Sequence, residues 1–396
     1  MTKQNILFIT QYYEPEPFII SEVAKSLAAQ GNNVTVLTGL PNYPEGKVYP
    51  GYHAGHFSEQ GMQLIRLKIR PRKQGKVNLF LNYLSYAFQA SRKVLTFGNE
   101  FDVVYVYQLS PILLAIPGII YKSIHKKKLV LYCLDLWPQS LISGGIKPGS
   151  FVYNCFLGIS RYIYRRADIV QISSKSFEKY FKKEIKKVKV LRYQPQFADD
   201  YFLQSLPDEK VEEDKTHTHI LFAGNIGHLQ SLETWIEAVA LLKDSNLILD
   251  VVGDGSHFEA IKEKVQKYHL NDKVILHGRK PKSEMPIYYQ QADALAVSLI
   301  NDEVISYTLP GKVQTYMASK KPIIASINGE AADIIRTAEC GLVSPAENAE
   351  LLAENMRKFI EISQADKDRM ADNGVDYYLK HFTKADFVRR LIEDLQ

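Results

Sequence analysis

The residues best suited to chemistry in this sequence are Pro310-Gly311-Lys312, which follow a polar loop and precede a predicted amphipathic helix. A helix N-terminus presents backbone N–H groups without partners and the positive end of the helix dipole. A glycine and a lysine at that point suit a phosphate group. The spacing of a Walker P-loop is absent. Taken alone, the three residues fit a plain turn with a solvated lysine equally well.

Loops rich in glycine and small polar residues follow four of the predicted strands in the second half of the chain. Glycine lets the backbone approach a ligand, although one glycine after a strand usually marks only a turn. The carboxyl ends of parallel strands meet at one edge of a sheet, so four such loops together predict a nucleotide-diphosphate pocket. Its expected residues are Gly224, Asn225, Gly227, Gln230, Gly253 and Gly311, with Arg279 and Lys312 as cations.

A single carboxylate, Asp135, stands directly after the predicted strand Leu129–Leu134 and just before Trp137. A carboxylate at a strand tip can orient a hydroxyl group or accept its proton. It also fits a turn or helix N-cap aspartate. The loop Gln11–Phe18 follows the first predicted strand, so we expect it at the same edge of the sheet as Asp135.

The elements that must position these residues alternate between apolar strands and amphipathic helices, which predicts an α/β fold with parallel, doubly wound sheets. The polar, acidic stretch 197–217 interrupts the pattern and is the expected linker. We therefore expect two Rossmann-like domains facing across a cleft, the default place for an active site. The strands expected before the linker are 6–10, 34–38, 103–107, 129–134 and 169–173, and those after it are 220–224, 247–252, 274–277, 294–298, 323–326 and 341–343.

Charge is distributed unevenly along the 396 residues. Residues 1–200 carry a net charge of +14 and residues 201–396 a net charge of −9. The basic half indicates an anionic surface as partner, either lipid or nucleic acid, unless the charge is merely solvated. No recognised nucleic-acid module accompanies it, so we expect no nucleic-acid partner.

Three scattered cysteines without Cys-x-x-Cys spacing favour a reducing compartment, and no pattern of metal ligands is present. We expect no metal site and no signal peptide or membrane span, because the first apolar run, Asn5–Thr10, is too short. The basic segment Arg66–Lys76 followed by the aromatic and apolar segment Val77–Ala90 is typical of a protein lying on an anionic bilayer. A core helix after a solvated loop fits the same residues.

Five motifs together resemble family 4 retaining glycosyltransferases of the GT-B fold, and more closely the capsule and O-antigen branch identified as N-acetyl-L-fucosamine transferases. The resemblance covers nearly the whole chain. Its motifs are Leu40-Pro-Asn-Tyr-Pro-Glu-Gly46, Tyr107-Gln-Leu-Ser-Pro111, Asp135-Leu-Trp-Pro-Gln-Ser140, Phe222-Ala-Gly-Asn-Ile-Gly227 and Tyr307-Thr-Leu-Pro-Gly-Lys-Val-Gln-Thr315.

The resemblance implies that a sugar, such as an acetamido or deoxy sugar, moves from a UDP-sugar to a polyprenyl-diphosphate-linked saccharide with retained configuration. It implies no metal and no cofactor beyond the nucleotide sugar as substrate. The implied domains are 1–200 for the acceptor, 201–380 for the donor, and a helix at 381–396 that returns to the first domain. Asp135 and Lys312 would be catalytic, Tyr307, Thr308 and Thr315 would join the donor site, and Phe18, Tyr107 and Trp137 would bind the acceptor.

The sequence departs from the family pattern at the donor site. Tyr307 and Thr315 replace a Glu-x7-Glu pair that holds the donor sugar and ribose in many members, and Asn225 and Gln230 replace an Arg and a Lys that grip the diphosphate. Lys312 and the following helix N-terminus must therefore supply the missing positive charge. The glycine-rich first loop of the family is also replaced.

The resemblance implies a cytoplasmic enzyme held peripherally at the inner face of the cell membrane, within a possible biosynthetic complex for capsule or O-antigen. Two other functions remain open at this point. A nucleotide-sugar 2-epimerase would need acid and base carboxylates and no lipid-facing segment. A non-catalytic GT-B partner subunit would retain the fold without turnover.

Overall fold

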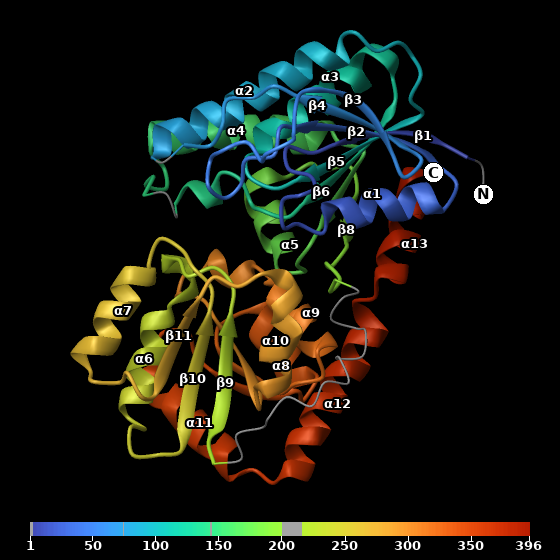
Figure 1. Cartoon of the computed structure of the whole chain (residues 1–396). Coiled ribbons are helices and arrows are strands. Elements are labelled where there is room, and N and C mark those ends of the chain that lie inside the picture. Colours follow the sequence, from blue (N-terminus) through green and yellow to red (C-terminus); the bar gives the residue numbers. More distant parts are fainter. Residues whose placement is uncertain (1–2, 74, 143–144, 200–215) are drawn as a thin grey trace. The chain divides into compact units, whose positions relative to one another are not determined.

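The computed structural model describes residues 3–73, 75–142, 145–199 and 216–396, and it divides the chain into two compact units (Figure 1). The first unit comprises Met1–Pro195 together with Phe387–Gln396, and the second comprises Gln196–Asp386. Most of the predicted linker, residues 200–215, lies outside the described residues.

The first unit is built on an eight-stranded sheet with the strand order β3-β4-β2-β1-β5-β6-β7-β8. All neighbouring strands are parallel except the β3–β4 hairpin at one edge. The strands are β1 (Asn5–Ile9), β2 (Asn33–Gly39), β3 (Gly55–Glu59), β4 (Met62–Leu67), β5 (Val103–Gln108), β6 (Lys128–Cys133), β7 (Ile169–Ile172) and β8 (Leu191–Tyr193).

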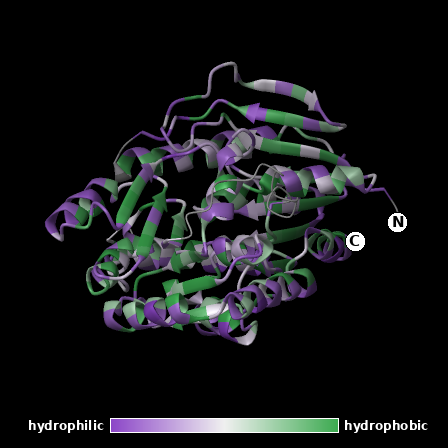
Figure 2. Cartoon of the chain, turned by 60° about the horizontal axis from the view of Figure 1, so that its bottom comes forward, coloured by the Kyte–Doolittle hydropathy of each residue, from purple (hydrophilic) through white to green (hydrophobic). Residues whose placement is uncertain are grey.

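Helices connect these strands, and the central strands are therefore covered by them. The strands of the sheets are mainly hydrophobic, whereas the helices carry bands of both kinds of residue (Figure 2). Every residue of β5 is buried. The helices of this unit are α1 (Ile20–Ala29), α2 (Lys76–Val94), α3 (Ile116–His125), α4 (Phe151–Arg166) and α5 (Phe177–Tyr180), with short helical turns at Ile112–Ala115, Gln139–Leu141 and Phe181–Ile185.

The last helix, α13 (Lys384–Leu395), brings the chain back to the first unit. The Phe387 ring meets Tyr132 of β6 edge-on, with the ring centroids 5.5 Å apart. The carboxylate of Asp394 is buried, accepts a hydrogen bond of 2.7 Å from Gln171 Nε2 and pairs with Arg192. The return therefore begins at Phe387, inside the predicted segment 381–396.

The second unit contains a six-stranded, wholly parallel sheet with the order β11-β10-β9-β12-β13-β14. Its strands are β9 (Thr218–Ala223), β10 (Leu247–Val252), β11 (Val274–Gly278), β12 (Ala294–Ser298), β13 (Ile323–Ser326) and β14 (Gly341–Ser344). Its helices are α6 (Leu232–Ala240), α7 (Phe258–Lys267), α8 (Met285–Gln291), α9 (Gly311–Ala318), α10 (Glu330–Thr337), α11 (Ala349–Glu361) and α12 (Gln364–His381), with short helical turns at His228–Gln230, Lys282–Glu284 and Ile305–Tyr307.

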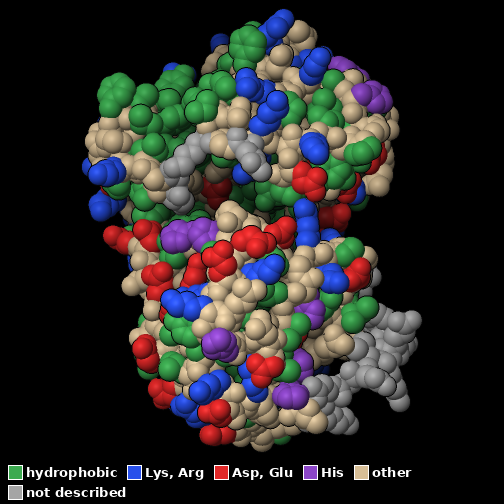
Figure 3. All heavy atoms as spheres, turned by 60° about the vertical axis from the view of Figure 1, so that its left-hand side comes forward, with side chains coloured by type: hydrophobic (Ala, Val, Ile, Leu, Met, Phe, Trp, Pro, Cys, Tyr) green, Lys and Arg blue, Asp and Glu red, His purple; other side chains and the backbone are tan. Residues whose placement is uncertain are grey.

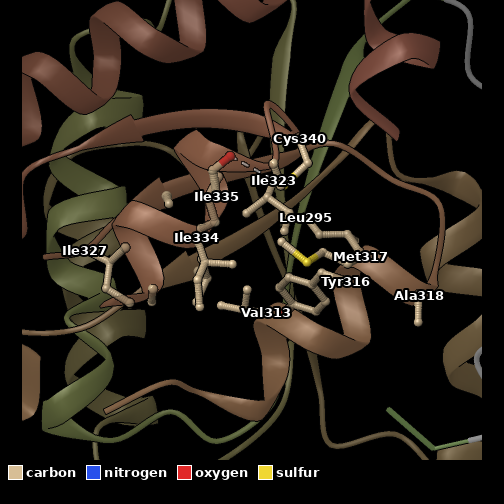
Figure 4. Packing of buried hydrophobic residues seen from close by; sticks show 14 of the residues in the cluster. Leu295, Val313, Tyr316, Met317, Ala318, Ile323, Ile327, Ile334, Ile335 and Cys340 are labelled. Atoms are coloured by element: carbon tan, nitrogen blue, oxygen red, sulfur yellow. Dashed lines mark hydrogen bonds between the residues drawn. The ribbon is translucent and has the colours of Figure 1, made fainter. Parts of the chain in front are cut away.

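Helix α9 is anchored in one of the two hydrophobic clusters that flank this sheet (Figure 4). Val313, Tyr316 and Met317 are completely buried there and pack with residues of β12, β13 and α10. Burying side chains of this size stabilises the fold by about 1.5–3 kcal/mol each. The N-terminus of α9 is therefore held by the core of the second unit.

Three parts of the first unit differ from the sequence expectation, one of them the short edge strand β8, which was not predicted. The β3–β4 hairpin was not predicted, because β3 is a short edge strand with only partly buried and exposed residues. Arg66, counted in the basic segment, lies in β4 with 6% of its surface exposed and its guanidinium 4.9 Å from the Tyr52 ring centroid. Arg66 is therefore a core residue and does not contribute to a basic surface.

Candidate functional site

The carboxyl ends of β9, β10 and β11 are joined backbone to backbone in the second unit. The Gly224 N–H donates to the Val252 carbonyl at 2.8 Å, and the Gly253 N–H donates to the Gly278 carbonyl at 2.9 Å. Gly253 has φ +151°, and a Cβ built on it would lie 1.8 Å from the Gly224 carbonyl oxygen. Only glycine fits that position, so the loops form a closely spaced backbone surface.

The loop after β9 is held together by Gln230, whose Oε1 accepts hydrogen bonds from the Gly227 N–H and from Asn225 Nδ2, each at 3.1 Å. The Gln230 carbonyl in turn accepts a bond of 2.5 Å from Ser298 Oγ on β12. Gly227 was expected in the diphosphate pocket, but its amide is already paired with Gln230 in this structure. The hydrogen bond between the Asn225 and Gln230 side chains thus helps to fix the conformation of the loop.

Lys312, the second residue of α9, lies against this loop. Its Nζ is 3.9 Å from the centroid of the Phe222 ring, and a Cβ on Gly224 would lie 3.0 Å from it. Among the described residues, the ammonium has no ion-pair or hydrogen-bond partner. Desolvation by burial lowers the pKa of Lys312 to about 7. An ammonium with so little compensation provides a site for an anion.

The start of α9 supports the same conclusion. Pro310, the residue before the helix, is extended and makes no side-chain cap hydrogen bond to this end. The Tyr316 hydroxyl, one turn into α9, donates to the Ala223 carbonyl at 3.3 Å and so ties the helix to the end of β9. The first amides of α9, its dipole and Lys312 thus lie at the carboxyl edge of the sheet.

The remaining residues predicted for the donor site lie outside the Gly224 loop. Thr315 Oγ1 donates to the Gly311 carbonyl within α9 at 3.0 Å. The Tyr307 hydroxyl donates to Glu303 Oε1 at 2.8 Å, and this bond and partial burial raise the pKa of Tyr307. Thr308 lies between this turn and α9, and Arg279 is exposed directly after β11.

Sequence reasoning missed Gln314 on α9, which is completely buried. Neither of its side-chain amide atoms has a hydrogen-bond partner within the described residues. Buried amides are normally paired, so Gln314 adds unused hydrogen-bonding capacity to the helix that carries Lys312. A glutamine inside an amphipathic helix pattern gave no signal.

In the first unit, Asp135 follows β6 and is joined to two other side chains. Its Oδ2 accepts a hydrogen bond of 2.7 Å from Ser110 Oγ, which itself accepts one of 3.0 Å from Trp137 Nε1. Burial raises the pKa of Asp135, and the Ser110 bond opposes that effect. The carboxylate is thus oriented and easier to protonate than an exposed one.

The predicted acceptor residues fall into three different environments. Tyr107 is 1% exposed and packs against Phe8 and Tyr132, so it is a core residue and its expected acceptor contact is wrong. Trp137 is 4% exposed and bonds to Ser110. Phe18 is half-buried, at the carboxyl end of β1.

Phe18 belongs to an aromatic cluster with Tyr12 and Tyr43, whose ring centroids lie 5.2–5.9 Å apart. The Arg72 guanidinium lies 5.1 Å from the Tyr43 centroid. Buried Glu16 holds the loops of this cluster, because its carboxylate accepts backbone bonds from Tyr13, Asn42 and Tyr43. An aromatic surface with a cation beside it suits an anionic, sugar-bearing ligand.

The surface of the first unit includes an apolar stripe on α2. Val77, Phe80, Leu84 and Phe88 recur at helical spacing and are 73%, 38%, 38% and 61% exposed. Figure 3 shows a group of hydrophobic side chains on the first unit with Lys and Arg side chains beside it. In the described part of the chain, no helix is long and apolar enough to cross a bilayer.

Comparison with known proteins finds a family that the second unit resembles. Residues 206–376 match the family model described as glycosyl transferases group 1. The second unit is therefore similar in sequence to the group 1 glycosyl transferases. A lysine and a helix N-terminus at one sheet edge both suit a phosphate group.

The matches extend beyond that unit. The chain is 25% identical to the probable glycosyltransferase WbjE of Pseudomonas aeruginosa over 74% of each chain. It is also 25% identical to the putative colanic acid biosynthesis glycosyl transferase WcaI of Escherichia coli K12, over 63% of this chain and 65% of that one. The solved structure of Anabaena HepE in complex with UDP aligns with a TM-score of 0.71 at 15% identity, covering 99% of both chains.

The chain has the GT-B fold, with two Rossmann-like units, as the sequence predicted. In the second unit, the structure brings together Gly224, Gly253, Gly311 and Lys312. In the first, it brings together Asp135 and Trp137 through Ser110. Ser110 was not predicted as a site residue, although it lies in the loop after β5, at the carboxyl end of a parallel strand where ligands of such sheets bind.

Proposed function

We propose that this protein is a glycosyltransferase that moves a sugar from a UDP-sugar to a polyprenyl-diphosphate-linked saccharide during assembly of a bacterial surface polysaccharide. The observation that carries the proposal is the uncompensated ammonium of Lys312 beside the Gly224 loop at the start of α9. A nucleotide diphosphate is the substrate group that such a site suits.

Comparison with a relative supports UDP as the nucleotide, because HepE of Anabaena was solved in complex with UDP. The names of the relatives support polysaccharide assembly, because WcaI is named for colanic acid biosynthesis. An acetamido or deoxy sugar is the donor we favour, because Tyr307 and Thr315 stand where the resembling family has sugar-holding carboxylates. Both side chains are engaged within their own segments.

The proposed chemistry relies on charge stabilisation of the leaving group. As the bond to the sugar breaks, the diphosphate gains negative charge, and Lys312 with the amides of Gly311 and Lys312 stabilises it. We propose retention of configuration and no metal, with the departing phosphate accepting the proton of the attacking hydroxyl. Asp135, oriented by Ser110, would hold the acceptor hydroxyl or the sugar.

The first unit provides features that suit a lipid-linked acceptor. The stripe Val77, Phe80, Leu84 and Phe88 would lie in the headgroup region of an anionic bilayer, with exposed Arg70, Lys73 and Arg92 near it in sequence. We therefore propose peripheral attachment to the inner face of the cell membrane, where lipid-linked saccharides and UDP-sugars meet.

The test is a thermal-shift panel of UDP-, GDP-, dTDP- and CMP-sugars, followed by a transfer assay with a polyprenyl-diphosphate disaccharide, with and without EDTA. Stabilisation by UDP-sugars, lost in Lys312→Ala, together with EDTA-resistant transfer is the expected result. A stable complex with no turnover of any lipid-linked acceptor would contradict the enzyme function.

A further inference from the structure

A cavity of about 340 Å³ lies in the first unit between α2 and α4. Its walls are aromatic and aliphatic: Leu79, Phe80 and Tyr83 come from α2, and Val152 and Phe156 come from α4. The ring centroids of Phe80 and Phe156 are 6.0 Å apart, so the two helices meet at the cavity. Its volume is in the range of small-ligand pockets, about 300–1,000 Å³.

The inner wall of the cavity joins the polar chain around Asp135. Trp137 and Ser110 both line the cavity, and the Trp137 ring meets Phe156 with centroids 5.5 Å apart. The same Trp137 donates to Ser110, and Ser110 donates to Asp135. An apolar ligand in this cavity would therefore be in contact with the group that orients the candidate catalytic carboxylate.

The outer wall of the cavity belongs to the apolar surface of α2 and α4. Phe80 and Val152 line the cavity and are also 38% and 45% exposed. Their neighbours Val77 and Phe151 are 73% and 88% exposed without lining it. The cavity is thus continuous with a surface that an apolar phase would cover.

The two segments that supply most of the cavity walls are basic in sequence, although the Asp135 carboxylate lies behind Ser110 at the inner wall. Residues 60–99 and 136–167 contain no Asp or Glu and, besides the buried Arg66, eleven Lys or Arg. A neutral apolar ligand would gain nothing from this excess of positive charge. A lipid whose apolar chain ends in phosphate would bind more strongly, because the cations attract its headgroup.

We infer that this cavity binds the isoprenoid segment next to the diphosphate of the acceptor lipid, an inference that rests on the proposed function. The contact with Trp137 and Ser110 favours the substrate lipid, because only a substrate must be placed relative to Asp135. An acyl chain of the surrounding bilayer or a second copy of this chain would need no such contact.

The experiment titrates the full-length protein with farnesyl diphosphate, a soluble diphosphate with three isoprene units, by calorimetry. Val152→Trp fills the mouth of the cavity and keeps the surface apolar. The matched control is the adjacent Phe151→Ser, which removes an apolar side chain outside the cavity. Val152→Phe is a smaller insertion for use if the tryptophan variant does not fold.

We expect Val152→Trp to weaken farnesyl diphosphate binding at least about tenfold and Phe151→Ser to change it less than about twofold. Attachment to phosphatidylglycerol vesicles should show the reverse pattern, and UDP binding should be the same in both variants. In transfer assays, Val152→Trp should raise KM for the polyprenyl acceptor and leave kcat nearly unchanged.

Three outcomes would overturn the inference. Equal farnesyl diphosphate binding in wild type and Val152→Trp would place the lipid elsewhere. Displacement of farnesyl diphosphate by phosphatidylglycerol vesicles free of isoprenoid would make the cavity a site for bilayer acyl chains. A dimer that Val152→Trp dissociates would make it an interface between copies. If wild type binds farnesyl diphosphate as expected yet transfers no sugar, the proposed function fails while the cavity assignment stands.

Discussion

The ammonium nitrogen of Lys312 lies 3.9 Å from the centroid of the Phe222 ring, at the point where β9 ends and α9 begins. The aromatic face compensates part of the charge, as cation–π contacts do. Burial still lowers the pKa of Lys312 to about 7. The folded protein without ligand therefore holds a cation that it stabilises poorly, and a bound diphosphate removes that cost.

Replacing Lys312 by methionine should stabilise the protein without ligand and abolish its response to UDP. The methionine removes the desolvated charge, so we expect Tm at pH 6 to rise by about 2–4 °C, equivalent to ~1 kcal/mol. Thermal denaturation with and without UDP measures both effects. Lys320→Met is the control, because Lys320 is exposed and pairs with Asp372 at the surface. Retention of the UDP-induced shift in Lys312→Met would contradict the assignment.

The affinity for UDP should fall as the pH rises above 7. Below pH 7 the Lys312 amine is protonated in the free protein, and above it the proton must be taken up on binding. The bound diphosphate favours the charged form, so Kd should increase by up to about tenfold per pH unit until the pKa of the complex is reached. Calorimetry between pH 6.5 and 9 in buffers of different ionisation enthalpy measures Kd and proton uptake. A flat profile in wild type would exclude Lys312 from the phosphate site.

Replacing Asp135 by asparagine should lower kcat by about 10²–10⁴-fold, the usual contribution of a positioned acid–base group. UDP binding should be unchanged, since Asp135 belongs to the first unit and the phosphate site to the second. Ser110→Ala should lower kcat less, because it removes only the bond that orients the carboxylate. Steady-state kinetics and a UDP titration test both variants, and an equal loss in kcat and UDP affinity would indicate damage to the fold.

Replacing Gly253 by alanine should disrupt the donor loops. The added Cβ would meet the Gly224 carbonyl at 1.8 Å, in a conformation that L-residues rarely adopt. We expect a loss of stability of about 1–3 kcal/mol and a larger loss of UDP affinity. Gly158→Ala in α4 is the matched control, because its Cβ meets nothing within 4 Å. Chemical denaturation measures the difference, and similar behaviour of the two variants would show that the loops tolerate displacement.

Replacing Asp250 by asparagine should destabilise the second unit at neutral pH. Burial alone would raise the pKa of Asp250, but hydrogen bonds of 2.7 Å with His219 and His277 outweigh it and lower the pKa. A lowered carboxyl pKa stabilises the fold above about pH 4, and this contribution is lost as the pH falls through the folded-state pKa. We expect the free energy of unfolding of the variant to be about 1–3 kcal/mol below that of wild type at pH 7, and this difference to shrink below pH 4. Urea denaturation at both pH values measures it, and a deficit independent of pH would contradict this account.

The sequence by itself determined the two α/β sheets, because continuous apolar strands between amphipathic helices have few other solutions. It also identified the strand-end position of Gly224, Gly253 and Asp135 and the helix start at Lys312, since these depend on local order alone. The positions of these candidate donor and acceptor residues along the chain were therefore predictable, but their contacts were not.

Only the tertiary structure decided which of the candidate site residues are free to contact a ligand and which are buried or already hydrogen-bonded. Tyr107 lies in a continuous apolar strand with both faces covered, and its side chain is a core residue. The Gly227 amide is paired by Gln230, three residues on, and Arg66 is buried against Tyr52. The cavity between α2 and α4 depends on contacts such as Phe80 with Phe156, 76 residues apart in the sequence. Local pattern encodes the strands and their ends, whereas burial and pairing arise from contacts that form only when distant segments pack.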